Sequence, residues 1–218
     1  MPSPRLPSAW QILTAVTALL IAKVTVSIVM NYGDYLPADF DTGFLQGRRS
    51  YFWGAYSWAF YTHIVSGPCS LLLGLLLLSK SLRLRAPAWH RRLGRIQVAN
   101  VALLLTPSGL WMARYAETGA VAGTGFGVLA LLTGTCAVVG WKSAVSRRFA
   151  EHRRWMTRCF MLLCAAVVLR LQAGLATVTE FDADWLYPFA AWTSWLVPLL
   201  INELIQKSPR RPLRSWIR

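Results

Sequence analysis

The stretch from Gly119 to Trp141 reads GAVAGTGFGVLALLTGTCAVVGW and contains no charged residue. About 20 mostly apolar residues are enough for an α-helix to cross the hydrocarbon core of a bilayer. Five further stretches have the same character, so spans are predicted over residues 10–30, 56–79, 93–115, 119–141, 156–178 and 186–206. Only 15% of the 218 residues are charged, against about 25% in a soluble domain. The chain is therefore predicted to be an all-α membrane protein, a six-transmembrane-helix bundle in which residues 1–218 form a single transmembrane domain.

Basic residues gather in every second connection between these spans. Residues 1–9, 80–95, 142–158 and 207–218 carry 1, 6, 6 and 5 Lys and Arg residues. The other connections hold three arginines and most of the acids. The positive-inside rule then places the basic connections and both termini in the cytoplasm. The net charge of +14 does not indicate nucleic-acid binding, because that would need basic residues gathered on one soluble surface.

Glycine and proline inside the spans predict close packing and bends. Gly119, Gly123 and Gly127 recur at every fourth position, which lets a neighbouring backbone approach one helix face, either within the bundle or in a homo-oligomer. Proline removes a backbone donor and frees the carbonyl four residues earlier. Bends or a polar cavity are therefore expected near the intramembrane prolines, which are Pro68, Pro107 and Pro198.

Three side chains with potential positive charge are predicted at one depth, about 10 Å below the outer interface at ~1.5 Å per residue. Lys23 and His63 lie about seven residues from the outer ends of their spans, and Arg170 about eight. Because helical side chains lean toward the helix N-terminus, Lys23 and Arg170 lean away from the nearer interface. A charge in this position usually faces the bundle interior. We therefore expect an internal polar site around Arg170, unless Glu180 or Asp182 pairs with it.

A second group of candidates lies at the cytoplasmic ends of two spans. His90 and His152 begin the similar sequences His-Arg-Arg-Leu-Gly-Arg and His-Arg-Arg-Trp-Met-Thr-Arg, so both are expected at the inner interface. The arginines of these motifs are Arg91, Arg92, Arg95, Arg153, Arg154 and Arg158. Three interpretations stay open: plain basic anchors, contacts to a phosphate or anionic lipid headgroup, or imidazole ligands of a metal or haem iron. Glu203, near the inner end of the last span, is expected to form a structural ion pair with Arg95 or Arg158.

These residues favour a membrane protein that binds a small anionic ligand or a lipid within the bundle. A carboxylate, a quinone head or haem propionates would suit a pocket lined by cations. One alternative is a cytochrome b-like haem or quinone-linked redox protein, with haem b as cofactor; His63 would then need a non-histidine second ligand such as Met112. Another alternative is a small-solute transporter. The sequence contains no motif of the soluble enzyme classes, so any enzyme activity would be that of a membrane oxidoreductase.

Four stretches of the chain resemble a known family. They are Thr-His-Ile-Val-x-Gly-Pro from Thr62, the two His-Arg-Arg motifs, the second preceded by Glu151, and Ala165–Leu171. The chain is similar over about residues 55–180 to an uncharacterised bacterial family of predicted multi-pass membrane proteins. The resemblance implies a membrane protein and assigns no activity. Together with the predicted topology it favours a location in the bacterial inner membrane.

Overall fold

The computed structural model describes residues 9–41 and 43–207, and no β-strand occurs among them. The α-helices are α1 (Ala9–Met30), α2 (Arg49–Phe52), α3 (Ala55–Leu78), α4 (Lys80–Arg85), α5 (Pro87–Ala99), α6 (Thr106–Ala113), α7 (Ala120–Val145), α8 (Phe149–Leu163), α9 (Ala165–Val178) and α10 (Leu186–Lys207). Two 3₁₀ turns, η1 (Asn31–Asp34) and η2 (Gly43–Leu45), and a π-helical segment, η3 (Asn100–Leu105), complete the elements. Arg5 and the basic residues 208–218, which contribute to the predicted orientation, lie outside the described residues.

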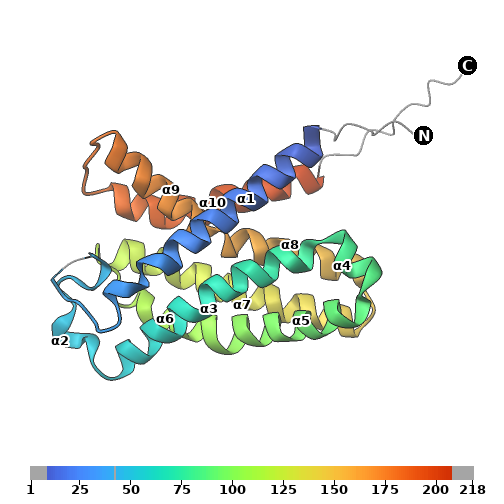
Figure 1. Cartoon of the computed structure of the whole chain (residues 1–218), viewed down its shortest axis with the longest axis horizontal. Coiled ribbons are helices and arrows are strands. Elements are labelled where there is room, and N and C mark those ends of the chain that lie inside the picture. Colours follow the sequence, from blue (N-terminus) through green and yellow to red (C-terminus); the bar gives the residue numbers. More distant parts are fainter. Residues whose placement is uncertain (1–8, 42, 208–218) are drawn as a thin grey trace, which may run out of the picture.

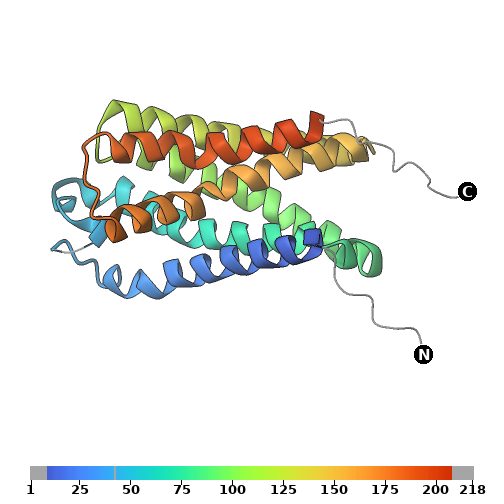
Figure 2. The same ribbon diagram turned by 90° about the horizontal axis from the view of Figure 1, so that it is seen from above.

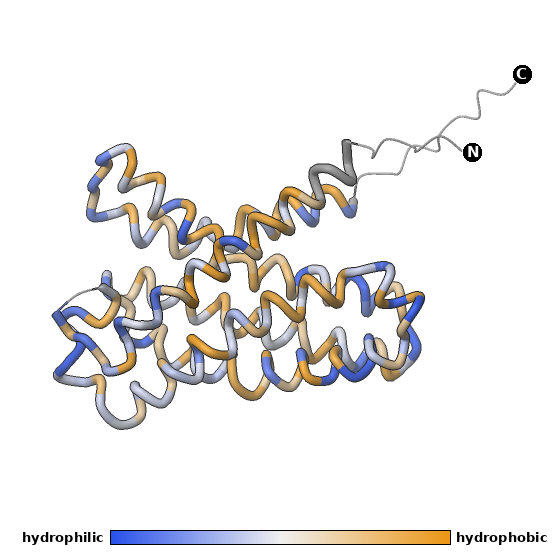
Figure 3. The backbone as a smooth tube through the Cα atoms, in the orientation of Figure 1, coloured by the Kyte–Doolittle hydropathy of each residue, from blue (hydrophilic) through white to orange (hydrophobic). Residues whose placement is uncertain are grey.

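Five helical stretches in the described part of the chain are long and apolar enough to cross a membrane. They are Ala15–Asp34, Ala55–Leu78, Pro87–Ala113, Ala120–Val145 and Phe149–Val178. α10 has 22 residues but falls outside this set. Its mean hydropathy is lowered by Asn202 and Glu203 and by the polar and aromatic residues of its first half. Apolar residues dominate the middle of the helices and polar ones their ends (Figure 3). The prediction of an all-α, multi-pass membrane protein is thus confirmed, and the five stretches correspond to the first five of the six predicted spans.

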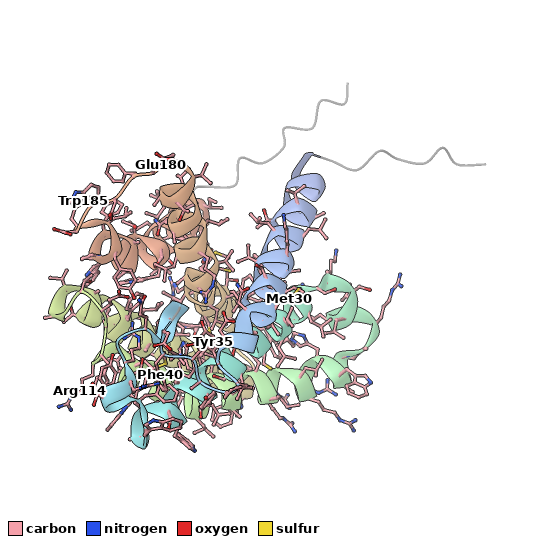
Figure 4. All side chains as sticks on the ribbon, turned by 60° about the vertical axis from the view of Figure 1, so that its left-hand side comes forward. Met30, Tyr35, Phe40, Arg114, Glu180 and Trp185 are labelled. Atoms are coloured by element: carbon pink, nitrogen blue, oxygen red, sulfur yellow. The ribbon has the colours of Figure 1, made fainter. Side chains whose placement is uncertain are left out.

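The helices form two layers with α8 packed between them (Figures 1 and 2). One layer contains α3, α5, α6 and α7, and the other contains α1, α9 and α10. The connections 31–54, 114–119 and 179–185 gather at one end of the molecule, on the left in Figure 1. Figure 4 turns this end forward and labels Tyr35, Arg114 and Glu180 on the three connections. The basic connections 79–86 and 146–148 lie at the opposite end, together with the start of α1 and the end of α10 (Figure 1). We call these the acidic end and the basic end.

Two of the long stretches are interrupted near their middle. The stretch Pro87–Ala113 passes through the π-helical η3, which ends two residues before Pro107, a residue without an N–H to donate. The stretch Phe149–Val178 breaks at Cys164, where ψ is −10°, so that α8 and α9 are separate rods. Beyond this break α9 continues at an angle to α8 (Figure 1), while α10 packs on α7, where Trp192 donates from Nε1 to the Val121 carbonyl at 3.0 Å. These interruptions allow a space between the two layers.

Side-chain amides and hydroxyls join α3 to the third stretch inside the membrane region. Asn100 donates from Nδ2 to the carbonyl of Ser66 (3.0 Å) and to Ser70 Oγ (2.8 Å). Gln97, which is buried, donates to the carbonyl of Ser70 (3.0 Å). A polar group in an apolar setting is stabilised by such a partner, so these bonds fix how the two helices pack. The surrounding core is apolar and centres on α8, with Phe160 and Leu162 buried.

The segment 31–54, which we call the outer cap, folds over the acidic end. Its Phe40, Leu45 and Phe52 pack against Tyr56 and Phe60 of α3 in one buried cluster. Arg48, only 5% exposed, anchors the cap: it donates to the Tyr115 carbonyl (3.2 Å) and lies 3.5 Å from the Glu117 carboxylate. The aromatic residues of this segment thus form a structured cap over the bundle end.

An ion pair attaches α10 to α8 near the basic end. Arg158 donates from Nε and Nη2 to the two carboxylate oxygens of Glu203, at 2.6 and 2.8 Å. This bidentate geometry is the strongest arrangement of the two groups. The predicted structural pairing of Glu203 is confirmed, with Arg158 as its partner.

The glycine row of the fourth span has three different environments. Gly119 adopts φ +78°, a conformation that favours glycine, at the start of α7. A Cβ atom on Gly123 would lie 2.7 Å from the Ala113 carbonyl oxygen, so this glycine allows close approach of α6 within the bundle. Gly127 faces open space. The possibility of a homo-oligomer through this row stays a prediction, and Gly123 is already used inside the subunit.

Candidate ligand cavity

A cavity of about 460 Å³ lies between the two helix layers, toward the acidic end. Its walls come from α1, the outer cap, α3, α6, α7, α8, α9 and α10. The volume lies within the range of small-molecule sites, about 300–1,000 Å³. The interruptions at η3 and Cys164 both border it, since Leu105, Thr106, Leu163 and Ala165 are lining residues.

Arg170 lines the cavity wall and is itself an exposed residue. Its guanidinium donates to the carbonyl of Ala166 (3.3 Å), one turn earlier in α9, as the predicted lean toward the helix N-terminus implies. Among the described residues no carboxylate lies within ion-pair distance of it. The pairing with Glu180 or Asp182 that the sequence left open is therefore absent, because both acids lie in the connection beyond α9. Arg170 faces the cavity with its charge unbalanced.

Two tyrosines of the outer cap lie near Arg170. Tyr32 donates its hydroxyl to the Ile64 carbonyl (2.6 Å), which is the carbonyl that Pro68 leaves without an α-helical donor. Tyr35 also lines the cavity. Burial raises the pKa of the Tyr35 phenol, and the nearby positive charge of Arg170 partly offsets that rise. A proline in α3 thus fixes a tyrosine at the edge of the cavity.

His63 lies in the same cavity, on α3. Its Nδ1 is 3.3 Å from Ser108 Oγ, and Ser108 donates its own hydrogen to the Leu104 carbonyl at 2.6 Å. With the Ser108 hydrogen directed to Leu104, the contact is made by Nδ1–H of His63 donating to Ser108 Oγ. Met112, the possible second haem ligand, also lines the cavity. Lys23 does not: it is exposed on the outer side of α1.

Arg48 is the other arginine of the cavity wall. Unlike Arg170, it is surrounded by acceptors: the carbonyls of Phe44 (2.6 Å) and Tyr115 (3.2 Å), the Tyr51 hydroxyl and the Glu117 carboxylate. Its charge is therefore already compensated, and its contribution is to hold the outer cap in place.

The two His-Arg-Arg motifs lie away from the cavity, on α5 and α8 at the basic end. His152 donates from Nδ1 to the Gly140 carbonyl at 2.9 Å, whereas Nδ1 of His90 is buried without a partner. The arginines exposed there are Arg91, Arg92, Arg95, Arg153 and Arg154; Arg158 is used in the pair with Glu203. The structure thus brings His63 and Arg170 to one cavity and separates both from His90 and His152. No group of three or more His, Cys, Asp or Glu residues suited to a metal ion occurs in the described part of the chain.

Sequence reasoning missed the tyrosines of the cavity wall. Tyr32, Tyr35, Tyr56 and Tyr187 all line it, but each lies near a span end, where aromatic residues commonly mark the membrane interface. One signal was available in the sequence. Pro68 leaves a backbone carbonyl of α3 without its helical donor, and such a carbonyl needs a hydroxyl or amide nearby.

An all-helical chain with several apolar spans and a cavity inside the bundle defines a multi-pass membrane protein. The chain belongs to the predicted membrane protein family DUF2306, whose model matches residues 60–206. That region includes His63, both His-Arg-Arg motifs and Arg170, and the family has no assigned function. No curated protein and no solved structure matches the chain.

Proposed function

We propose that this protein binds a small amphipathic anion in the cavity between its helix layers, with Arg170 as the anion contact. The observation that carries the proposal is the unbalanced guanidinium of Arg170 in the wall of a mostly apolar cavity. An arginine at the centre of a membrane helix costs about 2.5–3.5 kcal/mol on insertion scales. A ligand oxyanion would offset that cost, because a guanidinium offers parallel N–H donors that match a carboxylate.

The proposal extends to the topology. Six spans with both termini in the cytoplasm of a bacterial inner membrane would put the cavity in the outer leaflet. Support comes from the charges: six basic residues in each of the segments 80–95 and 142–158, against acids at the opposite end. α10 would be the sixth span, held by the pair of Glu203 with Arg158. The exposed arginines of the His-Arg-Arg motifs would then contact anionic headgroups of the inner leaflet.

Thermal unfolding in a neutral detergent tests the anion contact, with decanoate as probe and decanol as its uncharged analogue. A probe at about 100 times its Kd stabilises the folded state by about 2.7 kcal/mol, which corresponds to a rise in Tm of roughly 5–10 °C for a chain of this size. We expect that rise with decanoate and not with decanol. Arg170→Met should abolish it without destabilising the unliganded protein, since Arg170 has no carboxylate partner to lose.

Arg114→Met is the matched control. Arg114 is exposed at the acidic end and does not line the cavity, so this variant should respond to decanoate as the wild type does. Equal stabilisation by decanol, or an unchanged decanoate response in Arg170→Met, would refute the proposed anion site.

A further inference from the structure

The cavity changes in character from its mouth to its floor. Polar and aromatic residues line the part of the cavity near the acidic end. Three of these lining residues are exposed, and we call them the mouth: Asn31, Phe44 and Arg170. The floor is formed by Leu71, Leu162 and Leu163, which are 2%, 2% and 8% exposed. A ligand that fits this gradient has its polar group at Arg170 and an aliphatic part below it.

The depth of the apolar part follows from helix geometry. Leu163 precedes Arg170 by seven residues on the α8–α9 stretch, which is about 10 Å at 1.5 Å per residue. The guanidinium of Arg170 reaches back to the Ala166 carbonyl, so about 6 Å of this depth lies below the guanidinium. An extended chain advances roughly 3.5 Å for every three bonds. The space below the guanidinium therefore matches an aliphatic chain of about five bonds.

Small residues keep this lower part open. Gly67 lines the cavity on α3, and a Cβ atom added to it would meet only Leu105 Cδ1, at 3.9 Å. Ala130 and Ala166 line it from α7 and α9. Side chains larger than these would occupy the volume that lies between the mouth and the floor.

The charge of the wall limits the charge of the ligand. Arg48 is compensated by Glu117, so Arg170 contributes the one unbalanced positive charge among the arginines that line the cavity. A monoanion neutralises it, whereas a dianionic phosphate monoester, whose second pKa is about 6, would leave one negative charge uncompensated in an apolar site.

We propose that the cavity is a site for an aliphatic monocarboxylate, with its carboxylate at Arg170 and its chain extending to Leu71 and Leu163. This rests on the proposed anion-binding function and adds the class of ligand and the length of its apolar part. Each methylene that leaves water for the cavity should tighten binding about fourfold, until the chain reaches the floor.

Binding of linear carboxylates from acetate to decanoate tests the inference. The full-length protein in nanodiscs is dialysed to equilibrium with each radiolabelled carboxylate, and uptake by empty nanodiscs is subtracted. For the wild type we expect affinity to rise about fourfold per methylene up to about hexanoate and to level off beyond it. Decyl phosphate should bind at least about tenfold more weakly than decanoate.

Two glycine variants probe the chain site itself. Gly67→Leu fills the cavity about 6 Å above Leu71, so it should weaken hexanoate by about tenfold or more and leave acetate within about twofold. Gly174→Leu is the matched control, because Gly174 lies on α9 with open space around it and does not line the cavity; it should behave as the wild type.

The outcomes separate the two proposals. If binding depends on Arg170 but shows no levelling with chain length, or if Gly67→Leu and Gly174→Leu behave alike, the monocarboxylate site is refuted and the anion site stands. Decyl phosphate binding as tightly as decanoate would refute the monoanion preference in the same way. If no carboxylate of any length binds above the empty nanodiscs, both proposals fail.

Discussion

Loss of one charge from the Arg158–Glu203 pair should detach α10 from α8. Glu203→Gln keeps the shape of the side chain but removes its charge, which leaves the guanidinium of Arg158 without a counter-ion. Both side chains are about one quarter exposed, 25% and 27%, and the two contacts are short, 2.6 and 2.8 Å. Breaking a fully buried pair costs about 3–5 kcal/mol, and partial exposure reduces this to about 2–3 kcal/mol here.

Thermal unfolding of the detergent-purified protein measures this cost. For a chain of this size about 2–3 kcal/mol lowers Tm by roughly 4–12 °C. The control is Glu151→Gln, the same substitution in the Arg148–Glu151 pair, whose side chains are 57% and 45% exposed. That variant should change stability by at most about 0.5 kcal/mol, because an exposed helical pair contributes little.

A double variant shows whether the unpaired charge is the cause. Arg158→Met combined with Glu203→Met leaves no charge to desolvate, so it should recover most of the stability lost in Glu203→Gln. The reasoning fails if Glu203→Gln is as mild as Glu151→Gln, or if the double variant is less stable than Glu203→Gln.

Two further predictions address the topology and the cofactor. Single cysteines are introduced into a cysteine-free variant of the protein, and intact cells are treated with a membrane-impermeant thiol reagent. The reagent should label Asp182→Cys and should not label Arg85→Cys or Gln206→Cys. Labelling of Gln206→Cys together with Asp182→Cys would mean that α10 does not cross the membrane. An optical spectrum of the purified protein tests the haem alternative: the anion-binding proposal expects no Soret band, and a band that shifts on reduction and is lost in His63→Ala would favour a His63 haem, with Met112 as the other ligand within the cavity wall.

The parts of the site that sequence could predict are those set by position along one helix. The depth of Arg170 and His63 follows from counting residues to the span ends, and the direction of the Arg170 side chain follows from helix geometry. Both residues do line one cavity. Lys23 shares their depth but points to the other side of α1, because depth alone does not say which face of a helix meets its neighbours.

Pairing across helices was only partly predictable. Glu203 is the one acid in the inner half of the last predicted span, so a basic partner could be expected, and Arg158 rather than Arg95 provides it. For Arg170 the nearest acids in the sequence, Glu180 and Asp182, lie beyond the end of α9. The choice between partners depends on how α8, α9 and α10 are placed, and no residue pattern within one helix contains that information.

The sequence by itself determined that this protein is a set of apolar helices with basic and acidic ends, because lipid admits only segments that satisfy their own backbone hydrogen bonds and charges stay at the ends. Only the tertiary structure decided that the π segment before Pro107 and the break at Cys164 leave a cavity between two layers. It also decided that Tyr32 donates to the carbonyl freed by Pro68. Among the described residues, it left Arg170 in the cavity wall without a counter-ion. These features depend on which helix faces meet, and in an apolar medium nearly uniform helix surfaces do not specify that locally.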